Sequence, residues 1–355
     1  MSTTQACHTT RDQVPPPPTG DCMLRDASIV CVPALHIGQQ ANKLLALPNC
    51  SGEVMATFSR CTYLKGPEDE ILWLADPSLP AHRRSIQVHL PQNLLTTGMS
   101  FRLQGAKLVI GDRMMVDMEP ACELRFPQPD PKQVLPIPEV VHRSRRVTRI
   151  LGTSKEADGL GQLILLLGND RYKVSRPPSD TFLNRALGPI RRIVEACIRC
   201  DFNRIALESL PLIGYGPGLT PSGDDFLGGL LFTSTWLRLA YPGQFDWDAQ
   251  WTERIVSTAR FQTNRISHTL MKDLAHGHGP QPLHTFLLAL LMDVNFEGLV
   301  EVVQPLLEIG HSSGWDLLAG VLTGMLLLNE KSSLSATWLR LLFRRNTLSF
   351  SREGT

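Results

Sequence analysis

A proline-rich segment divides this 355-residue chain into two parts that favour different secondary structures. Residues 127–138 read PQPDPKQVLPIP and contain five prolines. Proline fixes φ and lacks a backbone N–H, so such a segment continues neither a helix nor a central strand. Short alternating apolar runs precede it, and longer runs with helical periodicity follow it. We therefore expect an α+β fold.

These changes in pattern predict four regions. Residues 1–25 include the polyproline run Pro15–Pro18 and are expected to form a disordered tail. Residues 26–128 are expected to form a β-rich domain, a small sandwich or barrel-like fold. Residues 129–138 are expected to be a proline-rich linker, and residues 139–350 a mainly α-helical domain.

The expected elements follow from hydrophobic periodicity and from glycine and proline punctuation. The expected strands are Glu53–Tyr63, Ile71–Leu74, Ser85–Leu90, Ser100–Leu103, Lys107–Ile110, Met115–Met118 and Cys122–Phe126. The expected helices are Ala34–Leu47, Val140–Leu151, Thr181–Cys200, Asp225–Leu239, Trp251–Leu274, His284–Met292, Glu297–Ile309, Trp315–Leu328 and Ser335–Arg344. Gly159–Gly168 fits either a buried helix or a strand.

The composition favours a soluble globular protein with 43% hydrophobic and 19% charged residues. A net charge of +1 and only 6% aromatic residues argue against nucleic-acid binding. No apolar run reaches membrane-spanning length and no secretory signal is visible, so we expect a cytoplasmic protein without membrane association. The eight cysteines are scattered and are expected to be free thiols.

The segment with the strongest functional signal is residues 213–231, IGYGPGLTPSGDDFLGGLL. Its alternating glycines permit backbone conformations that other residues avoid. Ser222 and Asp225 have the spacing of a capping box, and an apolar helical run follows. Thr220 as N-cap, with Pro221 at the first helical position, is an alternative start. Either start places a rigid glycine loop at a helix N-terminus, which offers N–H groups to an anion.

A second segment repeats part of this pattern. Residues 310–322 read GHSSGWDLLAGVL, and aligning Ser313 with Ser222 also aligns Asp316 with Asp225. The repeat therefore predicts a second capped helix start of similar chemistry. The first segment has Asp224 where the second has Trp315, so the extra carboxylate is specific to the first loop.

The two segments predict an anion site between two helix starts. The candidate anion-binding residues are Gly216, Gly218, Thr220, Ser222, Gly223, Thr263, Arg265, Ser267, His311, Ser312, Ser313, Gly314 and Asp316. Asp224 is the candidate proton acceptor, and Asp225 is the second candidate catalytic carboxylate. Under the alternative interpretation, these small and capping residues serve tight helix packing.

Other polar clusters carry weaker signals. Residues 263–267 lie within an expected helix, where Thr263 and Ser267 share one face; this polar stripe lines a site or faces solvent or a crossing helix. No cofactor is predicted, although Asp224 and Asp225 could hold Mg²⁺ beside a bound phosphate. His276, His278 and His284 lie in and after a glycine- and proline-rich loop, and a metal site there is a minor alternative.

Three motifs together resemble a known family. Gly214–Gly229 reads G-x-G-x-G-L-T-P-S-G-D-D-F-L-x-G, Thr263–Ser267 reads T-x-x-I-S, and Ile309–Gly320 reads I-G-H-S-S-G-W-D-L-L-A-G. In this order they are similar to motifs of a bacterial family that includes the AllH subunit of oxamate carbamoyltransferase. The resemblance covers roughly residues 50–330 and is strongest in the helical half.

The resemblance implies a role in anaerobic allantoin breakdown, part of purine catabolism. There a complex of three different subunits converts oxalurate and phosphate into oxamate and carbamoyl phosphate, and the implied partners are FdrA-type and AllG-type subunits. These ligands are all small anions, which fits the predicted site, and Arg265 is a candidate partner for a carboxylate. Two alternatives are a non-catalytic scaffold or regulatory subunit and a stand-alone metal-dependent hydrolase.

Overall fold

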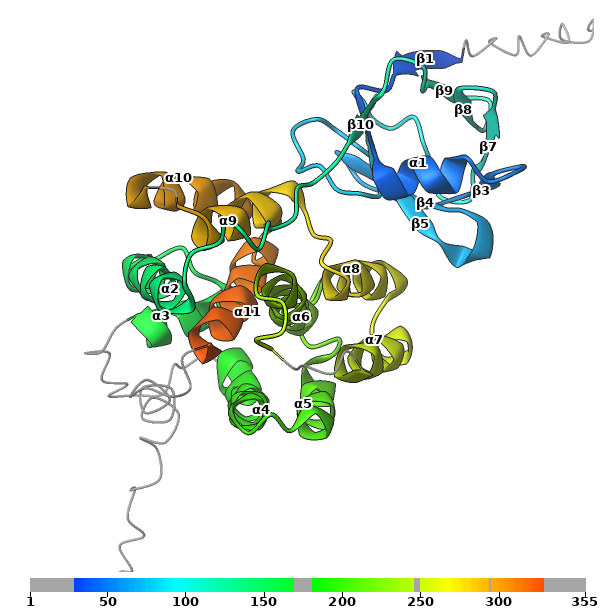
Figure 1. The fold of residues 1–355 in the computed structure, drawn as a ribbon. Coiled ribbons are helices and arrows are strands. Elements are labelled where there is room, and N and C mark those ends of the chain that lie inside the picture. The colour runs from blue at the N-terminus through cyan, green and yellow to red at the C-terminus, as the bar shows by residue number, and fades with distance from the viewer. Residues whose placement is uncertain (1–28, 169–180, 246–249, 294, 329–355) are drawn as a thin grey trace, which may run out of the picture.

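The fold is taken from a computed structural model, which describes residues 29–168, 181–245, 250–293 and 295–328. A curled ten-stranded sheet is followed by a region made mostly of helices, which confirms the expected α+β class (Figure 1). The expected tail, residues 1–25, and the expected helix Ser335–Arg344 lie outside the described residues.

The sheet has the strand order β1-β9-β8-β7-β3-β4-β5-β6-β2-β10. Its pairs are antiparallel except for β1 with β9, β2 with β10 and β5 with β6. The strands are β1 (Val30–Pro33), β2 (His36–Gly38), β3 (Ser51–Thr57), β4 (Cys61–Lys65), β5 (Ile71–Ala75), β6 (Ser85–Gln87), β7 (Ser100–Gln104), β8 (Lys107–Ile110), β9 (Met114–Asp117) and β10 (Cys122–Leu124).

Two expectations in this region are wrong. Glu53–Tyr63, expected as one strand, is the hairpin of β3 and β4, closed where Phe58 N donates to Cys61 O at 2.8 Å. Ala34–Leu47, expected as one helix, contains β2 and then the short helix α1 (Gln39–Leu45). Gly38 joins them where an added Cβ would lie 2.3 Å from His82 O, so the backbones approach too closely for a side chain.

The curled sheet encloses its own apolar core. Leu64, Leu72, Ile86 and Leu108 are fully buried there, and α1 contributes Ala41. Burial of each such aliphatic side chain stabilises a fold by about 1.5–3 kcal/mol. The alternating sequence pattern is thus explained by one sheet face that packs inward.

The second region consists of α2 to α11 and two 3₁₀ turns, η2 (Gly159–Gly161) and η3 (Leu210–Leu212). A third 3₁₀ turn, η1 (Pro67–Asp69), belongs to the sheet region. The helices are α2 (Ile137–Leu151), α3 (Gln162–Gly168), α4 (Thr181–Ile198), α5 (Phe202–Ser209), α6 (Ser222–Ala240), α7 (Gln250–Gln262), α8 (Arg265–Ala275), α9 (Gln281–Leu291), α10 (Phe296–Leu307) and α11 (Ser313–Leu327). The ambiguous segment Gly159–Gly168 is therefore helical.

The expected helix Trp251–Leu274 is two helices, because the chain breaks before α8. Asn264 has extended backbone angles and caps α8, with its Oδ1 accepting from Ser267 N at 3.0 Å. Asparagine is among the strongest N-cap residues, and its cap competes with continuation of the helix. Thr263 therefore lies before α8, and the expected single stripe within one helix is wrong.

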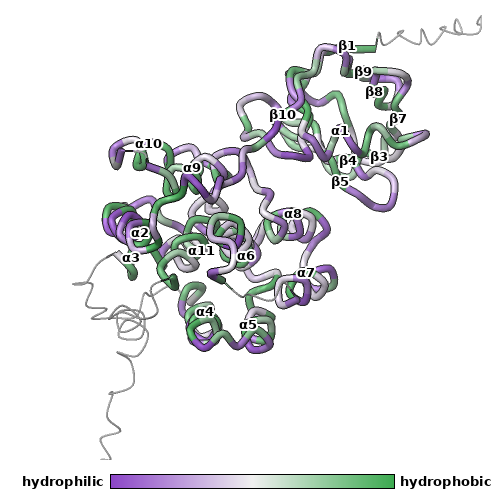
Figure 2. Tube along the Cα trace, in the orientation of Figure 1, coloured by the Kyte–Doolittle hydropathy of each residue, from purple (hydrophilic) through white to green (hydrophobic). Residues whose placement is uncertain are grey.

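Helices α6 and α11 lie at the centre of the helical region, and the other helices surround them (Figure 1). Both are apolar on nearly all sides, as expected for helices buried on every face. Figure 2 shows this centre as largely hydrophobic, with hydrophilic stretches on the outer helices. No helix in the described ranges is long and apolar enough to span a membrane.

The two regions meet along α8. Ile266 of α8 packs in one apolar cluster with Ile71 and Trp73 of β5. Beside it, Arg84 reaches Asp273 of α8 through Nε–Oδ2 at 2.5 Å and Nη2–Oδ1 at 3.0 Å. A bidentate arginine–carboxylate pair fixes orientation as well as distance, so it sets how the sheet lies against the helices.

Candidate functional site

Helices α6 and α11 cross through reciprocal glycine contacts. A Cβ added to Gly229 would lie 2.1 Å from Leu317 O, and one added to Gly320 would lie 2.0 Å from Phe226 O. Gly229 aligns with Gly320 in the repeated motif, and Phe226 aligns with Leu317. The repeat in the sequence is therefore a pair of equivalent helices, each packed against the backbone of the other.

The starts of the two helices exchange polar partners. The Ser313 hydroxyl lies beside the Asp225 carboxyl, and the Ser222 hydroxyl lies beside the Asp316 carboxyl. Thr220 joins the pair, with its Oγ1 at 2.7 Å from Ser313 Oγ. Side chains from two distant motifs thus form one hydroxyl–carboxyl cluster at two helix N-termini.

This arrangement corrects the capping expectations. Ser222 and Ser313 are the first helical residues rather than N-caps, and neither helix has a side-chain cap at its N-cap position. The Thr220 alternative is also wrong, since Pro221 occupies the N-cap position. Each serine instead faces the aspartate of the other helix, a pairing that spacing along the sequence does not reveal.

A loop from the preceding part of the chain binds Asp316. Asp316 Oδ1 accepts from Leu160 N at 2.6 Å and from Gly161 N at 3.2 Å. Asp316 Oδ2 accepts from Ser312 Oγ at 2.9 Å. Burial nevertheless raises the pKa of Asp316 to about 6. This contact was not predicted from the sequence, although Gly159 and Gly161 are a signal for it: an added Cβ on Gly159 would lie 2.6 Å from Asp316 Oδ1.

Asp225 is also buried within this cluster. Burial raises its pKa well above the ordinary value, and the nearby Asp316 and Asp224 carboxylates raise it further. Its Oδ2 has no hydrogen-bond partner among the residues that the structure describes. Near neutral pH its carboxyl is therefore far more prone to keep its proton than an exposed aspartate, and a protonated carboxyl is a hydrogen-bond donor.

Asp224 ties the glycine loop to α8. Its Oδ1 accepts from Gly214 N at 2.7 Å, while its Oδ2 accepts from Thr263 Oγ1 at 2.5 Å and Ser267 Oγ at 2.6 Å. The structure thus brings together the extra carboxylate of the first motif and the hydroxyls of Thr263 and Ser267. With both oxygens occupied, Asp224 positions the loop, and its proposed role as proton acceptor stays a prediction.

The glycine loop is held in a conformation that requires glycine. Gly214, Gly216 and Gly218 have φ values of 71°, 121° and 94°. Gly223 N donates to Tyr215 O at 2.8 Å, and Asn264 Nδ2 donates to Leu219 O at 2.8 Å. The loop is therefore anchored at both sides while residues 217–219 are exposed.

The remaining candidates lie at the edges of the cluster. Arg265 Nη1 pairs with Asp69 Oδ1 of the sheet region at 3.0 Å, so its carboxylate partner here belongs to the protein. His311 is 94% exposed and lies 3.1 Å from Asp158 Oδ2. Gly314 packs against the preceding helix, where an added Cβ would lie 1.9 Å from Leu306 O.

The histidines of the expected cluster make separate contacts with other residues. Buried His284 accepts from Gly279 N at 3.0 Å and stacks on Phe126, and burial lowers its pKa to about 4. His276 Nδ1 lies 2.7 Å from Lys272 O. Across residues 29–328, apart from the gaps given above, no three His, Cys, Asp or Glu side chains are grouped to hold a metal ion. Mg²⁺ beside Asp224 and Asp225 stays a prediction.

The raised pKa of Asp316 predicts a specific pH dependence of stability. Ionisation of this buried carboxyl costs more in the folded chain than in the unfolded chain, so folding loses about 2–3 kcal/mol as pH rises from 3.8 to about 6. We expect Asp316→Asn to remove this loss, so that variant and wild type diverge across that window and run parallel above it. Denaturant unfolding at a series of pH values measures the difference; a constant difference from pH 4 to 7 would contradict it.

The family comparison agrees with the motifs. The model of the family described as oxamate carbamoyltransferase subunit AllH matches residues 212–325, which include both glycine-containing motifs and α8. This match confirms the resemblance in the helical half of the chain. No solved structure matches the chain.

Proposed function

Taking the match to the AllH family as the premise, we propose that the chain is a subunit of an oxamate carbamoyltransferase-related complex and binds a small anion at the starts of α6 and α11. The supporting observation is that the serine hydroxyl at the start of each helix lies beside the aspartate carboxyl of the other helix. This pairing joins the two motifs, both of which lie within the matched range 212–325.

The cluster offers donors to an anion. The two helix N-termini contribute a positive dipole end, while the N–H groups of Gly223 and Gly314 already donate to Tyr215 O and Ile309 O, so the free donors are side-chain groups. The Thr220 and Ser313 hydroxyls, 2.7 Å apart, lie between these ends. Asp225, with its raised pKa, adds an O–H donor instead of a repelling charge. Phosphate, carbamoyl phosphate, oxamate and oxalurate all carry the anionic oxygens that such donors bind.

The roles within the site follow from these contacts. Asp224 holds the glycine loop through Gly214 N and binds the start of α8 through Ser267, so it is a positioning residue. Asp316 holds the Leu160 loop against the cluster. Asp225, Thr220 and Ser313 are the groups that contact the anion. FdrA-type and AllG-type partners supply the rest of the complex, which acts in allantoin catabolism.

Reconstitution with the two partner subunits tests this proposal. We expect Thr220→Val and Ser313→Ala each to lower the rate of oxalurate phosphorolysis by about tenfold or more, because a hydrogen bond to a charged group contributes about 1.5–3 kcal/mol. Thr285→Val is the matched control, since this hydroxyl bonds only to Gln281 O on the exposed side of α9. We expect its activity to equal that of the wild type.

The outcome also separates the alternatives. A complex that needs this chain for assembly but keeps full activity in both site variants would support a scaffold and refute the anion site. Stoichiometric metal in the purified chain, with hydrolysis in the absence of partners, would support the stand-alone hydrolase instead. Size-exclusion chromatography of each reconstituted complex distinguishes lost assembly from lost chemistry.

A further inference from the structure

The most exposed large apolar side chains of the described residues lie on two neighbouring helices, α5 and α7. Phe261 near the end of α7 is 85% exposed, and Leu207 of α5 is 63% exposed. No other large apolar side chain in the described ranges is more than 47% exposed. A phenylalanine left in water forgoes the free energy that its burial would supply, so a patch of such residues marks a contact surface.

Two contacts place Leu207 and Phe261 on one surface. Near the start of each helix, the Arg254 guanidinium of α7 donates to Asn203 Oδ1 of α5. Near the end of each, a Cβ added to Gly214, in the loop after α5, would lie 2.6 Å from the carbonyl oxygen of the last residue of α7. The helices therefore run side by side in the same direction. Leu207 lies one turn after Asn203, and Phe261 lies two turns after Arg254, so both share the faces that carry this exposed contact.

The tip of the glycine loop borders the same surface. Leu219 in this loop is 40% exposed, and its carbonyl oxygen accepts from Asn264 Nδ2 at 2.8 Å. Asn264 follows Phe261 by three residues, a stretch of chain that spans about 10 Å at most. An interface of standard size covers about 800 Å² on each partner, a patch roughly 30 Å across. Leu207, Leu219 and Phe261 therefore fit within one interface.

Two arginines beside this apolar patch have no carboxylate partner among the residues that the structure describes. Arg254 contacts the Asn203 amide, and the Arg260 guanidinium carbon lies 6.0 Å from the centroid of the Phe261 ring. The exposed Glu253 of the same helix lies 3.4 Å from a histidine nitrogen of α8. The exposed side of α7 thus carries two arginines and one glutamate, and both arginines remain available to an external carboxylate.

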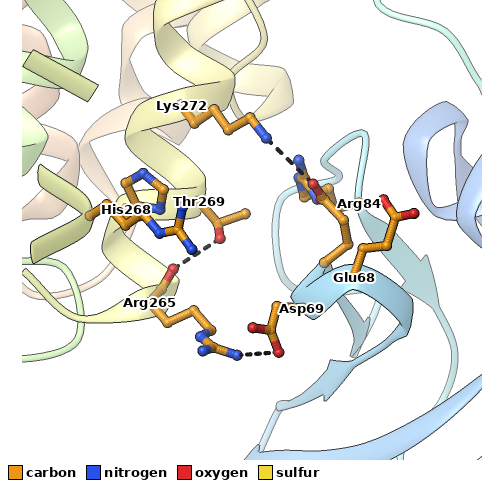
Figure 3. Close-up of a pocket in the computed structure, with 9 residues that line it drawn as sticks. Glu68, Asp69, Arg84, Arg265, His268, Thr269 and Lys272 are labelled. Atoms are coloured by element: carbon orange, nitrogen blue, oxygen red, sulfur yellow. Dashed lines mark hydrogen bonds and ion pairs between the residues drawn. The ribbon is translucent and has the colours of Figure 1, made fainter. Parts of the chain in front are cut away.

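The cations of the next helix, α8, differ in this respect. Figure 3 shows the polar cavity between α8 and the sheet region, across which Arg265 pairs with Asp69 at 3.0 Å. Lys272, one turn before the end of α8, lies 3.4 Å from Glu70 Oε1 of the sheet region. These cations are neutralised within the protein, so the positive charge left for a partner is that of α7.

We propose that the exposed face of α5 and α7, with the tip of the glycine loop, is the docking surface for another protein. The partner presents an apolar pocket for Phe261 and carboxylates that pair with Arg254 and Arg260. Aromatic residues and arginine are enriched at protein interfaces, and a few such side chains dominate the affinity. Thr220 of the proposed anion site follows Leu219 directly, so the partner contacts the loop that carries this site. This docking surface rests on the proposed function for the identity of its partner, another subunit of the complex.

Biolayer interferometry with the intact chain tests this surface, with the purified FdrA-type and AllG-type subunits as probes, each alone and both together. We expect Phe261→Ala to weaken the binding about tenfold or more, and Leu207→Ala to weaken it by a smaller factor. Arg254→Glu and Arg260→Glu are expected to slow association and to reduce its dependence on salt, because they reverse charges that attract the carboxylates of the partner.

Matched substitutions keep the result specific. Ile150→Ala truncates an apolar side chain of α2 that is 44% exposed, and Arg125→Glu reverses a charge after β10 that is 80% exposed. Both are expected to bind the subunits as the wild type does. Thr220→Val is expected to keep this affinity even where it loses activity, so failure of docking and failure of the anion site are measured separately. Thermal unfolding of Phe261→Ala is expected to match the wild type, because the ring is exposed.

Three results would overturn the docking surface. Wild-type affinity in Phe261→Ala and Arg254→Glu would refute it and leave the proposed complex intact. A wild-type chain that binds neither subunit would refute both the surface and the complex. A dimer of the isolated chain that Phe261→Ala dissociates, measured by analytical ultracentrifugation, would assign the face to a second copy of this chain instead.

Discussion

Asp273→Ala is expected to lower the free energy of unfolding by about 3–5 kcal/mol, because it leaves the Arg84 guanidinium buried without its main counter-charge. Asp273 is 3% exposed and Arg84 is 2% exposed, and the two form a bidentate pair at 2.5 and 3.0 Å. The pair also joins the sheet to α8. Denaturant unfolding followed by far-ultraviolet circular dichroism measures the change.

Two controls make this result specific to burial. Asp293→Ala removes a carboxylate that is 90% exposed and 3.4 Å from Arg143, and we expect a much smaller change. Arg84→Met combined with Asp273→Leu removes both charges and is expected to recover much of the stability lost in Asp273→Ala. Equal losses for Asp273→Ala and Asp293→Ala would show that the buried pair contributes no more than a surface pair.

The same pair predicts a loss of stability in acid. The Arg84 guanidinium, together with His82 and Arg83, outweighs the effect of burial and lowers the pKa of Asp273 below 3.8. The stabilisation is therefore complete above the unfolded-state pKa and disappears as pH falls through the lowered folded-state pKa. We expect this component of the acid transition to be missing in Arg84→Met combined with Asp273→Leu.

Gly320→Ala is expected to destabilise the fold by about 3 kcal/mol or to prevent folding, since the new methyl group would lie 2.0 Å from Phe226 O and 2.9 Å from Leu230 N. The clash is with backbone of the central helix α6, which cannot rotate away as a side chain can. Thermal unfolding and soluble yield measure the effect. Gly229→Ala, the equivalent change on α6, is expected to behave in the same way.

A matched glycine substitution isolates the role of close packing. At Gly66 an added Cβ would meet its nearest atoms at 3.6 Å, an ordinary contact, so Gly66→Ala is expected to leave stability nearly unchanged. A Gly320→Ala variant as stable as Gly66→Ala would mean that α6 and α11 do not cross as closely as the reciprocal contacts indicate.

The fold class was predictable because two signals in the sequence are local. The five prolines of residues 127–138 separate alternating apolar runs from runs with helical periodicity. Each periodicity is defined by residues close together in the sequence, so it can be recognised without knowing the tertiary structure. β8 begins and ends where its pattern predicts, at Lys107 and Ile110. The breaks within Glu53–Tyr63 and Trp251–Leu274 were not predicted. The turn in the first segment and the Asn264 cap in the second are flanked by apolar or amphipathic sequence, so the periodicity gave no sign of either break.

The candidate site was predictable in part. Residue types and the repeat identified Ser222, Asp225, Ser313 and Asp316 as related groups, and the family match covers them. Which serine faces which aspartate depends on how α6 and α11 cross, and no spacing along the chain encodes this. The contact of Leu160 with Asp316 was missed for the same reason, since the two residues come from segments far apart in the sequence.

Patterns along the chain are sufficient to predict the α+β division, the two related helix starts and the family resemblance of the helical half. They do not predict that each serine faces the aspartate of the other helix or that Asp224 holds the glycine loop, which depend on the packing of the helices. Backbone preference and periodicity act over only a few residues. Hydrogen bonds between buried side chains form only after Gly229 and Gly320 allow the two helices to touch.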